Sequence, residues 1–396
     1  MVYFVWLSLG ICAFALKENK TIAVLLALFI TIIFCFNTNA SDLLAYTMQY
    51  EGYTTYFTEP LFIWFGNLFH RIGFSFHVYR GFIAVVSIFI ITWFAFKFSP
   101  YPALVLFLYS VYPMTVDVVQ IRFTAAYIVA LLGIYYLVRF QHTHNVSDEI
   151  FFFLAIVVGA CFHYSAILYA ILGLLVLNIY KHRFMYLVII PLTVIIGVIA
   201  IDRFAPIISS FIGERKTSLW ISKEKYSSIR TIILILVCRG LPLMFSVFLT
   251  YILRSTHFKK TIGENSNGID LVHANIAVID LGEKDPNGFY DVVINRCLFL
   301  CMYYIFLFSI FEFTIAGDYE RLQRLGLLIG TILITRQLFY IEVRNRRLMM
   351  LLLAIIYFAY FASIMFVKGN ATGEKYVKYV FQQVMESNSI FGMIYH

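Results

Sequence analysis

The run FFFLAIVVGACFHYSAILYAILGLLVLNIY, residues 151–180, is almost entirely apolar and carries one histidine, His163, near its middle. As a single helix this run would be about 45 Å long, whereas the hydrocarbon core of a bilayer is about 30 Å thick. Two shorter helices that meet near His163 fit such a bilayer better. The run therefore predicts a membrane hairpin of two helices with His163 at its turn.

The rest of the chain has the same apolar character. Of 396 residues, 61% are hydrophobic and only 13% are charged, whereas soluble domains are about one quarter charged. Apolar runs that match membrane helices lie at about 2–16, 21–36, 79–97, 101–117, 121–139, 149–180, 184–203, 229–253, 294–315, 321–340 and 347–367. The predicted fold class is all-α: a polytopic integral membrane protein with about eleven or twelve transmembrane helices. Residues 1–396 would form a single transmembrane domain.

The net charge of +8 comes from basic residues that punctuate the apolar runs, as in loops that face anionic lipid headgroups. Nucleic-acid binding is therefore not expected. The clusters KENK (17–20) and EVRNRR (342–347) are expected on the cytoplasmic side. This orientation places residues 37–80 and a loop at 204–228 on the outer face, and a polar loop at 255–295 in the cytoplasm. It also places the turn at His163 on the outer face.

Within the outer segment 37–80, an amphipathic helix is predicted over 61–76. Asn67, His70 and Arg71 share one face of it because they are three and four positions apart. The opposite face is apolar and holds Leu61, Phe65, Leu68 and Ile72. We expect this helix to lie in the membrane interface.

Several common reaction classes lose their sequence support. The chain has no phosphate-binding P-loop, no dinucleotide fingerprint, no H-E-x-x-H and no paired C-x-x-C. Its six cysteines lie mostly in apolar runs and are interpreted as small buried side chains. No metal and no cofactor are expected.

Polar residues at the outer ends of the apolar runs are the candidate site. A charge near the centre of a bilayer costs about 2.5–3.5 kcal/mol, so such residues are kept where they pair or serve a function. His163 suits general acid–base catalysis because imidazole titrates near neutral pH, although a histidine in an apolar run is more often a core residue. Asp42 and Glu59 are alternative bases. The candidate anion-binding residues are Arg80, Arg122, Arg321 and Arg324.

Each of these residues also has a structural interpretation. Arg122 can extend toward lipid headgroups, and Asp117 lies close enough in sequence to pair with it. Arg321 and Arg324 can pair with Asp318 and Glu320. The tyrosines between Tyr46 and Tyr56, including Tyr50, are typical of an interfacial aromatic belt, and they are equally suited to stacking on sugar rings.

The order of several short motifs resembles the EpsG-type polysaccharide polymerases, within the broader Wzy class of O-antigen and capsule polymerases. The matching motifs are D-x3-Y (Asp42, Tyr46), EPLF (59–62), R-x3-A (Arg122, Ala126), FHYSAIL (162–168), Y-x-R-L (Tyr319 to Leu322) and the closing EKYVKYVFQ (374–382). The resemblance covers nearly the whole chain, and FHYSAIL following R-x3-A is its most specific part.

The resemblance implies a glycosyltransferase in the bacterial cytoplasmic membrane whose active face is periplasmic or extracellular. It would move a glycan from undecaprenyl pyrophosphate to a lipid-linked repeat unit without a metal or nucleotide. Arg122, Arg321 and Arg324, with Arg80, would bind the pyrophosphate. His163, Asp42 or Glu59 would accept the proton, while Tyr46, Tyr50 and Tyr319 would contact sugars. Expected partners are these lipid-linked oligosaccharides, membrane lipids and a chain-length regulator.

Three other functions remain open at this point. An O-antigen-ligase-like transferase would use the same chemistry on another acceptor. A flippase or transporter would place charges at mid-bilayer and show repeat symmetry, and neither is evident in the sequence. A multipass acyltransferase would also use an essential histidine.

Overall fold

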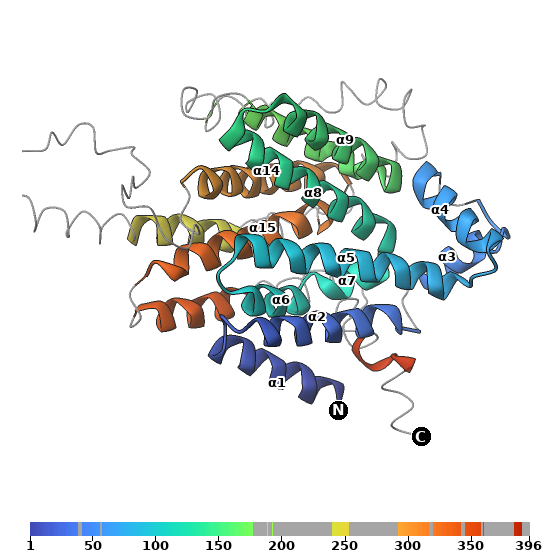
Figure 1. The fold of residues 1–396 in the computed structure, drawn as a ribbon, viewed down its shortest axis with the longest axis horizontal. Coiled ribbons are helices and arrows are strands. Elements are labelled where there is room, and N and C mark those ends of the chain that lie inside the picture. Colours follow the sequence, from blue (N-terminus) through green and yellow to red (C-terminus); the bar gives the residue numbers. More distant parts are fainter. Residues whose placement is uncertain are drawn as a thin grey trace, which may run out of the picture.

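The computed structural model describes residues 1–38, 42–55, 58–176, 240–252, 292–316, 320–341, 345–357 and 384–389, with the single positions 188, 192 and 359. Within these ranges the chain is helical, and an isolated bridge between Asn37 and Asn388 is the sole pairing of β type. The long helices lie side by side, and α3 and α4 project beyond one end of the bundle (Figure 1). The all-α prediction is confirmed for the described chain.

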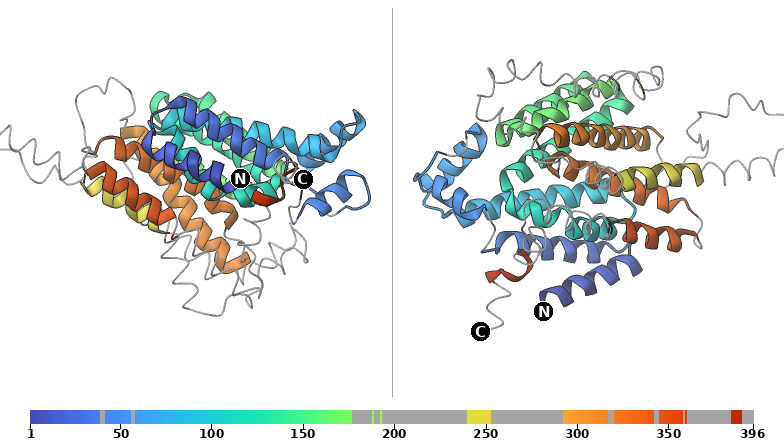
Figure 2. Two further views of the ribbon diagram at one scale, coloured as in Figure 1. Left: turned by 90° about the horizontal axis from the view of Figure 1, so that it is seen from below. Right: turned by 180° about the vertical axis from the view of Figure 1, so that it is seen from behind.

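The named helices follow the predicted apolar runs closely. In chain order they are α1 (Val2–Ala15), α2 (Lys20–Cys35), α3 (Leu43–Tyr50), α4 (Pro60–Arg71), α5 (Phe76–Phe98), α6 (Pro102–Val111), α7 (Met114–Val119), α8 (Ile121–Thr143), α9 (Val146–Phe162), the 3-10 helix η1 (Tyr164–Val176), α14 (Val292–Ala316) and α15 (Glu320–Phe339). Helical segments also cover Gly240–Ile252 and 345–357. Figure 2 shows the same bundle from below and from behind.

The predicted break at His163 is confirmed. Helix α9 ends at Phe162, His163 has extended backbone angles (φ −159°, ψ 121°), and η1 follows directly. A Cβ placed on Gly159 would lie 3.5 Å from Ala166, and one on Gly173 would lie 2.5 Å from the ring of Phe153. The two segments therefore run back along one another as a hairpin.

One predicted run is divided where the sequence interpretation had a single helix. The run 101–117 forms α6, which ends at Val111, and the short α7, which begins at Met114. Pro113 lies between them. It has no N–H to donate within a helix, and its ring disfavours helical geometry for the preceding residue. The division places Asp117 in the short helix α7, which directly precedes α8.

The two basic clusters predicted to be cytoplasmic meet at one end of the bundle, called here the basic end. Arg346 Nη2 donates to the carbonyls of Phe339 (2.8 Å) and Ile341 (2.9 Å), which end α15. Burial, and next the neighbouring Arg346 guanidinium, lower the pKa of Lys17 in the α1–α2 turn. The clusters predicted to share one side of the membrane thus meet in the fold.

The opposite end, called here the α4 end, holds α3, α4, the first turns of α5, α8 and α15, and the turn at His163. Helix α4 begins at Pro60 and packs through Phe62 and Gly66, which are buried. Leu68 and Ile72, predicted on its apolar face, remain exposed, as does Trp64. The apolar surface of α4 is therefore only partly covered by the described protein.

Large apolar side chains are also exposed along the outer helices. Phe4 of α1 is 75% exposed, Phe89 of α5 is 70% exposed and Leu154 of α9 is 52% exposed. Two helices, Phe76–Phe98 and Ile121–Thr143, are long and apolar enough to cross a membrane, and several shorter helices are similarly apolar.

The segment 384–389 completes the end of α2. The side-chain amide of Asn388 donates to the carbonyl of Ile32 (3.1 Å), and Ser389 N–H donates to the carbonyl of Phe36 (3.0 Å). Thr38 N–H in turn donates to the carbonyl of Ser387 (2.8 Å). The carbonyl of Phe36, at the C-cap of α2, has no intrahelical donor, and Ser389 supplies one. The carbonyl of Ile32 already accepts from Phe36 N–H (3.1 Å) and gains a second hydrogen bond from Asn388.

Two of the predicted loops lie wholly or mostly outside the described residues. These are 204–228 and 255–295, although α14 begins at Val292 and so includes the last residues of the second range.

Candidate functional site

Most residues predicted to form the site lie together at the α4 end. Asp42, Glu59, Arg80, Arg122, His163, Arg321 and Arg324 all occupy it, whereas Tyr319 lies outside the described residues. Two contacts join the segments that carry them. Tyr164 Oη donates to the carbonyl of Thr58 (3.2 Å), and the rings of Phe65 and Phe162 stack with centroids 5.9 Å apart. The hairpin turn and the start of α4 are therefore held against one another.

A strong ion pair joins Arg122 and Glu59. Arg122 Nη1 donates to Glu59 Oε2 at 2.6 Å, and the two side chains are only 14% and 7% exposed. Thr58 N–H donates to the same carboxylate oxygen at 3.1 Å. Glu59 is the N-cap residue of α4, where the helix dipole favours a negative charge. The carboxylate is thus held in place by both a helix terminus and a guanidinium.

Tyr46 lies against the same guanidinium. The Cζ atom of Arg122 is 5.6 Å from the centre of the Tyr46 ring. Burial raises the pKa of the Tyr46 phenol, and the charges of Arg122, Asp42 and Arg321 also act on it. The hydroxyl therefore stays protonated at neutral pH. The negative charge of Asp42 raises the pKa of this buried phenol further, whereas the positive charges of Arg122 and Arg321 lower it.

His163 lies at the hairpin turn and is 9% exposed. Its Nδ1 accepts a hydrogen bond from Ser165 N–H (3.3 Å), which leaves Nε2 as the nitrogen that carries the proton in neutral imidazole. The ring meets Phe123 edge to face, with centroids 5.3 Å apart and planes at 89°. Its orientation is therefore set by the backbone of the turn and by an aromatic ring of α8.

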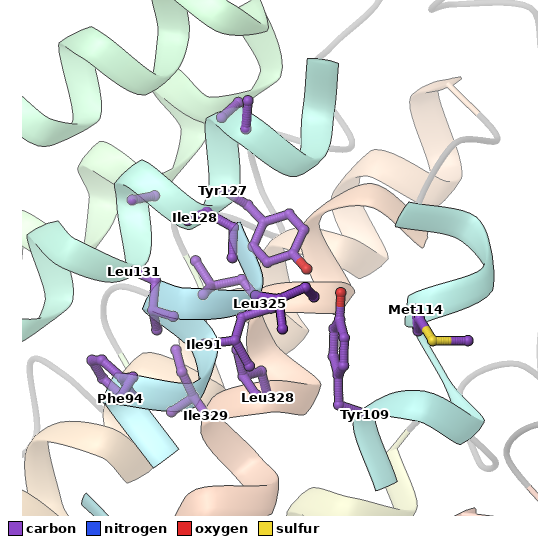
Figure 3. Packing of buried hydrophobic residues seen from close by; sticks show 14 of the residues in the cluster. Ile91, Phe94, Tyr109, Met114, Tyr127, Ile128, Leu131, Leu325, Leu328 and Ile329 are labelled. Atoms are coloured by element: carbon purple, nitrogen blue, oxygen red, sulfur yellow. The ribbon is translucent and has the colours of Figure 1, made fainter. Parts of the chain in front are cut away.

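Asp117 and Arg324 form a second ion pair, beneath the first. Arg324 Nη1 donates to Asp117 Oδ1 at 3.1 Å, and both side chains are 0% exposed. Tyr109 Oη (2.8 Å) and Tyr127 Oη donate to the other carboxylate oxygen. Figure 3 shows these two phenol oxygens turned toward one another beside apolar side chains such as Leu325. Sequence proximity suggested that Asp117 would pair with Arg122, and the structure pairs it with Arg324 instead.

The remaining predicted residues support the edge of the site. Arg80 is buried, donates from Nη1 to the carbonyl of Asn37 (2.6 Å) and lies beside Cys35. Tyr50 donates to the carbonyl of Phe74 (2.7 Å) and stacks on Tyr79. The hydroxyl of Tyr50 is therefore already used within the fold, and sugar contact by Tyr50 or Tyr46 stays a prediction.

An open groove of 610 Å³ lies between α2 and α5 near this end. Thr31, Val78 and Val85 are among its less polar lining residues, and Asn37, Thr38, His77 and Ser389 are among the polar ones. Among the described side chains, no three His, Cys, Asp or Glu residues gather as metal ligands.

Comparison with known families shows that residues 20–381 match a model of the EpsG family. This match spans the predicted site residues from Asp42 to Arg324 and confirms the resemblance seen in the short motifs. The curated proteins and the solved structures give no match.

Proposed function

Since this chain belongs to the EpsG family, we propose that it is a membrane-bound polysaccharide polymerase. In the proposed reaction, a growing glycan moves from undecaprenyl pyrophosphate to a lipid-linked repeat unit on the outer face of the bacterial cytoplasmic membrane. The observation that best supports this proposal is the Arg122–Glu59 pair, at one end of the bundle and beside Tyr46, Arg321 and the His163 turn.

The proposed membrane placement rests on the distribution of side chains over the bundle. Exposed apolar residues such as Phe4, Phe89 and Leu154 lie on the outer helices, between two polar ends. In water such exposed apolar side chains would promote aggregation, whereas they suit contact with lipid. We place the basic end in the cytoplasm and the α4 end outside, with Trp64 and Ile72 of α4 in the interface.

The donor pyrophosphate would bind at Arg122 and Arg321. In the protein without substrate, Glu59 Oε2 lies 2.6 Å from Arg122 Nη1, where a phosphate oxygen of the substrate would bind. An incoming pyrophosphate would displace this carboxylate and form charge-assisted hydrogen bonds with the guanidinium. The same guanidinium would stabilise the negative charge that develops as the pyrophosphate departs.

The chemical step would form one glycosidic bond. A hydroxyl of the acceptor sugar attacks the anomeric carbon of the donor, and the bond from that carbon to the pyrophosphate oxygen breaks. Undecaprenyl pyrophosphate leaves with the bonding electron pair. The hydroxyl proton passes to a base. His163 is our first candidate, through Nδ1, which would exchange its hydrogen bond from Ser165 N–H for the acceptor hydroxyl, and Asp42 or the displaced Glu59 are the alternatives.

The groove between α2 and α5 suits a polyprenyl chain. Its apolar residues, including Val78 and Val85, would contact the lipid, and its polar residues, including Asn37 and His77, would lie near the pyrophosphate. Arg80, which donates to the carbonyl of Asn37, would add positive charge behind this polar rim.

The direct test uses purified protein in lipid nanodiscs with its lipid-linked repeat unit and no added nucleotide. The wild-type protein should convert the single unit into a ladder of longer products. Arg122→Ala should lower the initial rate by about 10²–10³-fold, the usual cost of losing a donor that stabilises a developing negative charge. Arg321→Ala and His163→Ala should also slow the reaction.

The matched control is Arg139→Ala, which removes an arginine from the same helix at the basic end, where it pairs with Asp148 at 3.5 Å. Its ladder should equal that of the wild type. If wild-type protein that is folded and loaded with substrate makes no ladder, polymerase function is wrong. If all three site variants make the normal ladder, the site is wrong. Transfer to a different acceptor without a ladder would indicate a ligase.

A further inference from the structure

The pair of Asp117 and Arg324 is more completely buried than the predicted site above it. Both carboxylate oxygens of Asp117 accept hydrogen bonds, from Arg324 on one side and from two phenols on the other. Arg324 also donates from Nη2 to Gln120 Oε1. With 0% exposure, neither side chain can reach a substrate without a rearrangement of the core.

Stability alone gives a weak reason for such an arrangement. Removing two opposite charges from water costs several kcal/mol per ion, and well-packed apolar residues of similar volume often serve stability equally well or better. A buried polar centre can instead define one orientation among several. The elements that this centre joins are α6, α7, α8 and α15.

The first group that this centre orients is His163. The Cζ atom of Arg324 lies 5.2 Å from the centre of the Phe123 ring, and His163 packs edge-on against that same ring at 5.3 Å. Phe123 therefore contacts the buried guanidinium and the candidate base. If Arg324 moved, Phe123 would lose one of the surfaces that hold it, and the imidazole would lose its support.

The second group that it orients is Arg321. Arg321 and Arg324 are three positions apart on α15, so they project from neighbouring faces of the helix. Because Asp117 fixes Arg324, it also fixes the rotation of α15 about its axis. This rotation sets the direction in which Arg321, in the first turn of α15 at the α4 end, leaves the helix.

We propose that Asp117, Arg324, Gln120, Tyr109 and Tyr127 form a positioning centre that sets His163 and Arg321 without contacting substrate. The inference rests on the proposed function, since it concerns the same site. It assigns Arg324, which the sequence suggested as a pyrophosphate ligand, to a role within the core. Arg122 and Arg321, which are only partly buried, then provide the positive charge that a substrate can reach.

The test replaces the buried pair with apolar residues in the double variant Asp117→Leu, Arg324→Met, and measures the initial rate of ladder formation against substrate concentration. Loss of positioning should lower kcat by about 10²-fold, the cost of a displacement near 1 Å, while KM changes much less. Tyr127→Phe, which removes one hydrogen bond and leaves the ion pair, should fold normally and lower kcat in the same manner but less. The single variant Arg324→Lys, which keeps a positive charge beside Asp117, should have a kcat between those of the double variant and the wild type.

The matched control is Arg336→Met with Asn295→Leu. Arg336 is also a buried arginine of α15, at the basic end, where its Nε donates to Asn295 Oδ1 at 2.7 Å. We expect kcat near the wild-type value. The inference is wrong if Tyr127→Phe, or a folded Asp117→Leu, Arg324→Met protein, keeps wild-type kcat, or if KM alone rises. Absence of a ladder from the wild-type protein would instead contradict the proposed function.

Discussion

At the scale of single residues, the main feature of the candidate site is that the guanidinium of Arg122 is already paired with the carboxylate of Glu59. The two side chains are largely buried and 2.6 Å apart, so the guanidinium is neutralised before any ligand arrives. The proposed anionic substrate would therefore compete with a carboxylate that is part of the protein. This competition gives Glu59 a measurable effect on affinity, whether or not it takes part in the chemistry.

Glu59→Gln tests this competition. The amide can still accept a hydrogen bond from Arg122 but carries no charge, so inorganic pyrophosphate should bind more tightly, by about threefold to tenfold, or up to about 1.4 kcal/mol. Isothermal titration calorimetry on the purified protein measures the change. Asp148→Asn, which neutralises the partner of Arg139 at the basic end, should leave the affinity unchanged. Equal or weaker binding to Glu59→Gln would contradict competition.

Residue identities were more predictable than their pairings. The polar residues at the ends of apolar runs indicated the site because charges are costly within a membrane. Their partners are distant in sequence: Arg122 and Glu59 are 63 positions apart, and Arg324 and Asp117 are 207 apart. Helical spacing made Arg321 and Arg324 look equivalent. Only tertiary packing buries one of them completely and leaves the other partly exposed.

At the scale of elements, α8 and α9 approach one another closely because small residues line their interface. A Cβ on Gly133 would lie 3.2 Å from that of Ala155, and a Cβ on Gly159 would lie 2.8 Å from the carbonyl oxygen of Ala126. The second contact is with backbone, which cannot rotate away. Close contact through small residues is how helices associate where lipid surrounds them.

Gly159→Ala should therefore push α9 away from α8. We expect a loss of about 1–3 kcal/mol, as for other overpacked interiors, seen as a lower melting temperature of the purified protein. Gly81→Ala is the matched control, because its Cβ would lie an ordinary 3.8 Å from the Cys35 sulfur. That variant should be neutral or stabilised by up to about 1 kcal/mol. Equal melting temperatures for the two variants would contradict the close contact.

The boundaries of a helix could be predicted where an apolar run is too long to form a single membrane helix. The run 151–180 exceeds what one membrane helix needs, and the chain breaks at His163 as expected. The run 101–117 has the length of a single span, so length gave no signal there. Its division at Pro113 follows from the chemistry of proline, which apolar periodicity does not register.

At the scale of the whole molecule, the bundle has two chemically different ends. Lys17 and Arg346 lie together at one end, and the two most buried ion pairs among the described residues, Arg122–Glu59 and Arg324–Asp117, lie at the other. Sequence reasoning identified both sets, because short connections carry the charges and the helices alternate in direction. It could not identify which helices are neighbours, since apolar faces alone do not specify a partner.

The orientation of the two ends can be tested by labelling. Tyr53 is 77% exposed at the α4 end, and Ser147 is exposed at the opposite end, at the start of α9. In a background without the six native cysteines, Tyr53→Cys should react with a membrane-impermeant maleimide on intact cells, whereas Ser147→Cys should react only after permeabilisation. The reverse pattern would invert the proposed orientation.

The segment 384–389 also has a consequence for the timing of synthesis. Asn388 supplies a donor to the Ile32 carbonyl from 356 positions later in the chain. At about 5–20 residues per second, a ribosome needs about 20–70 s to travel that distance. During that interval the end of α2 lacks these donors, and Asn37, which accepts from Arg80, lacks its bridge to Asn388. The α4 end therefore reaches its final form only after residues 384–389 have been made.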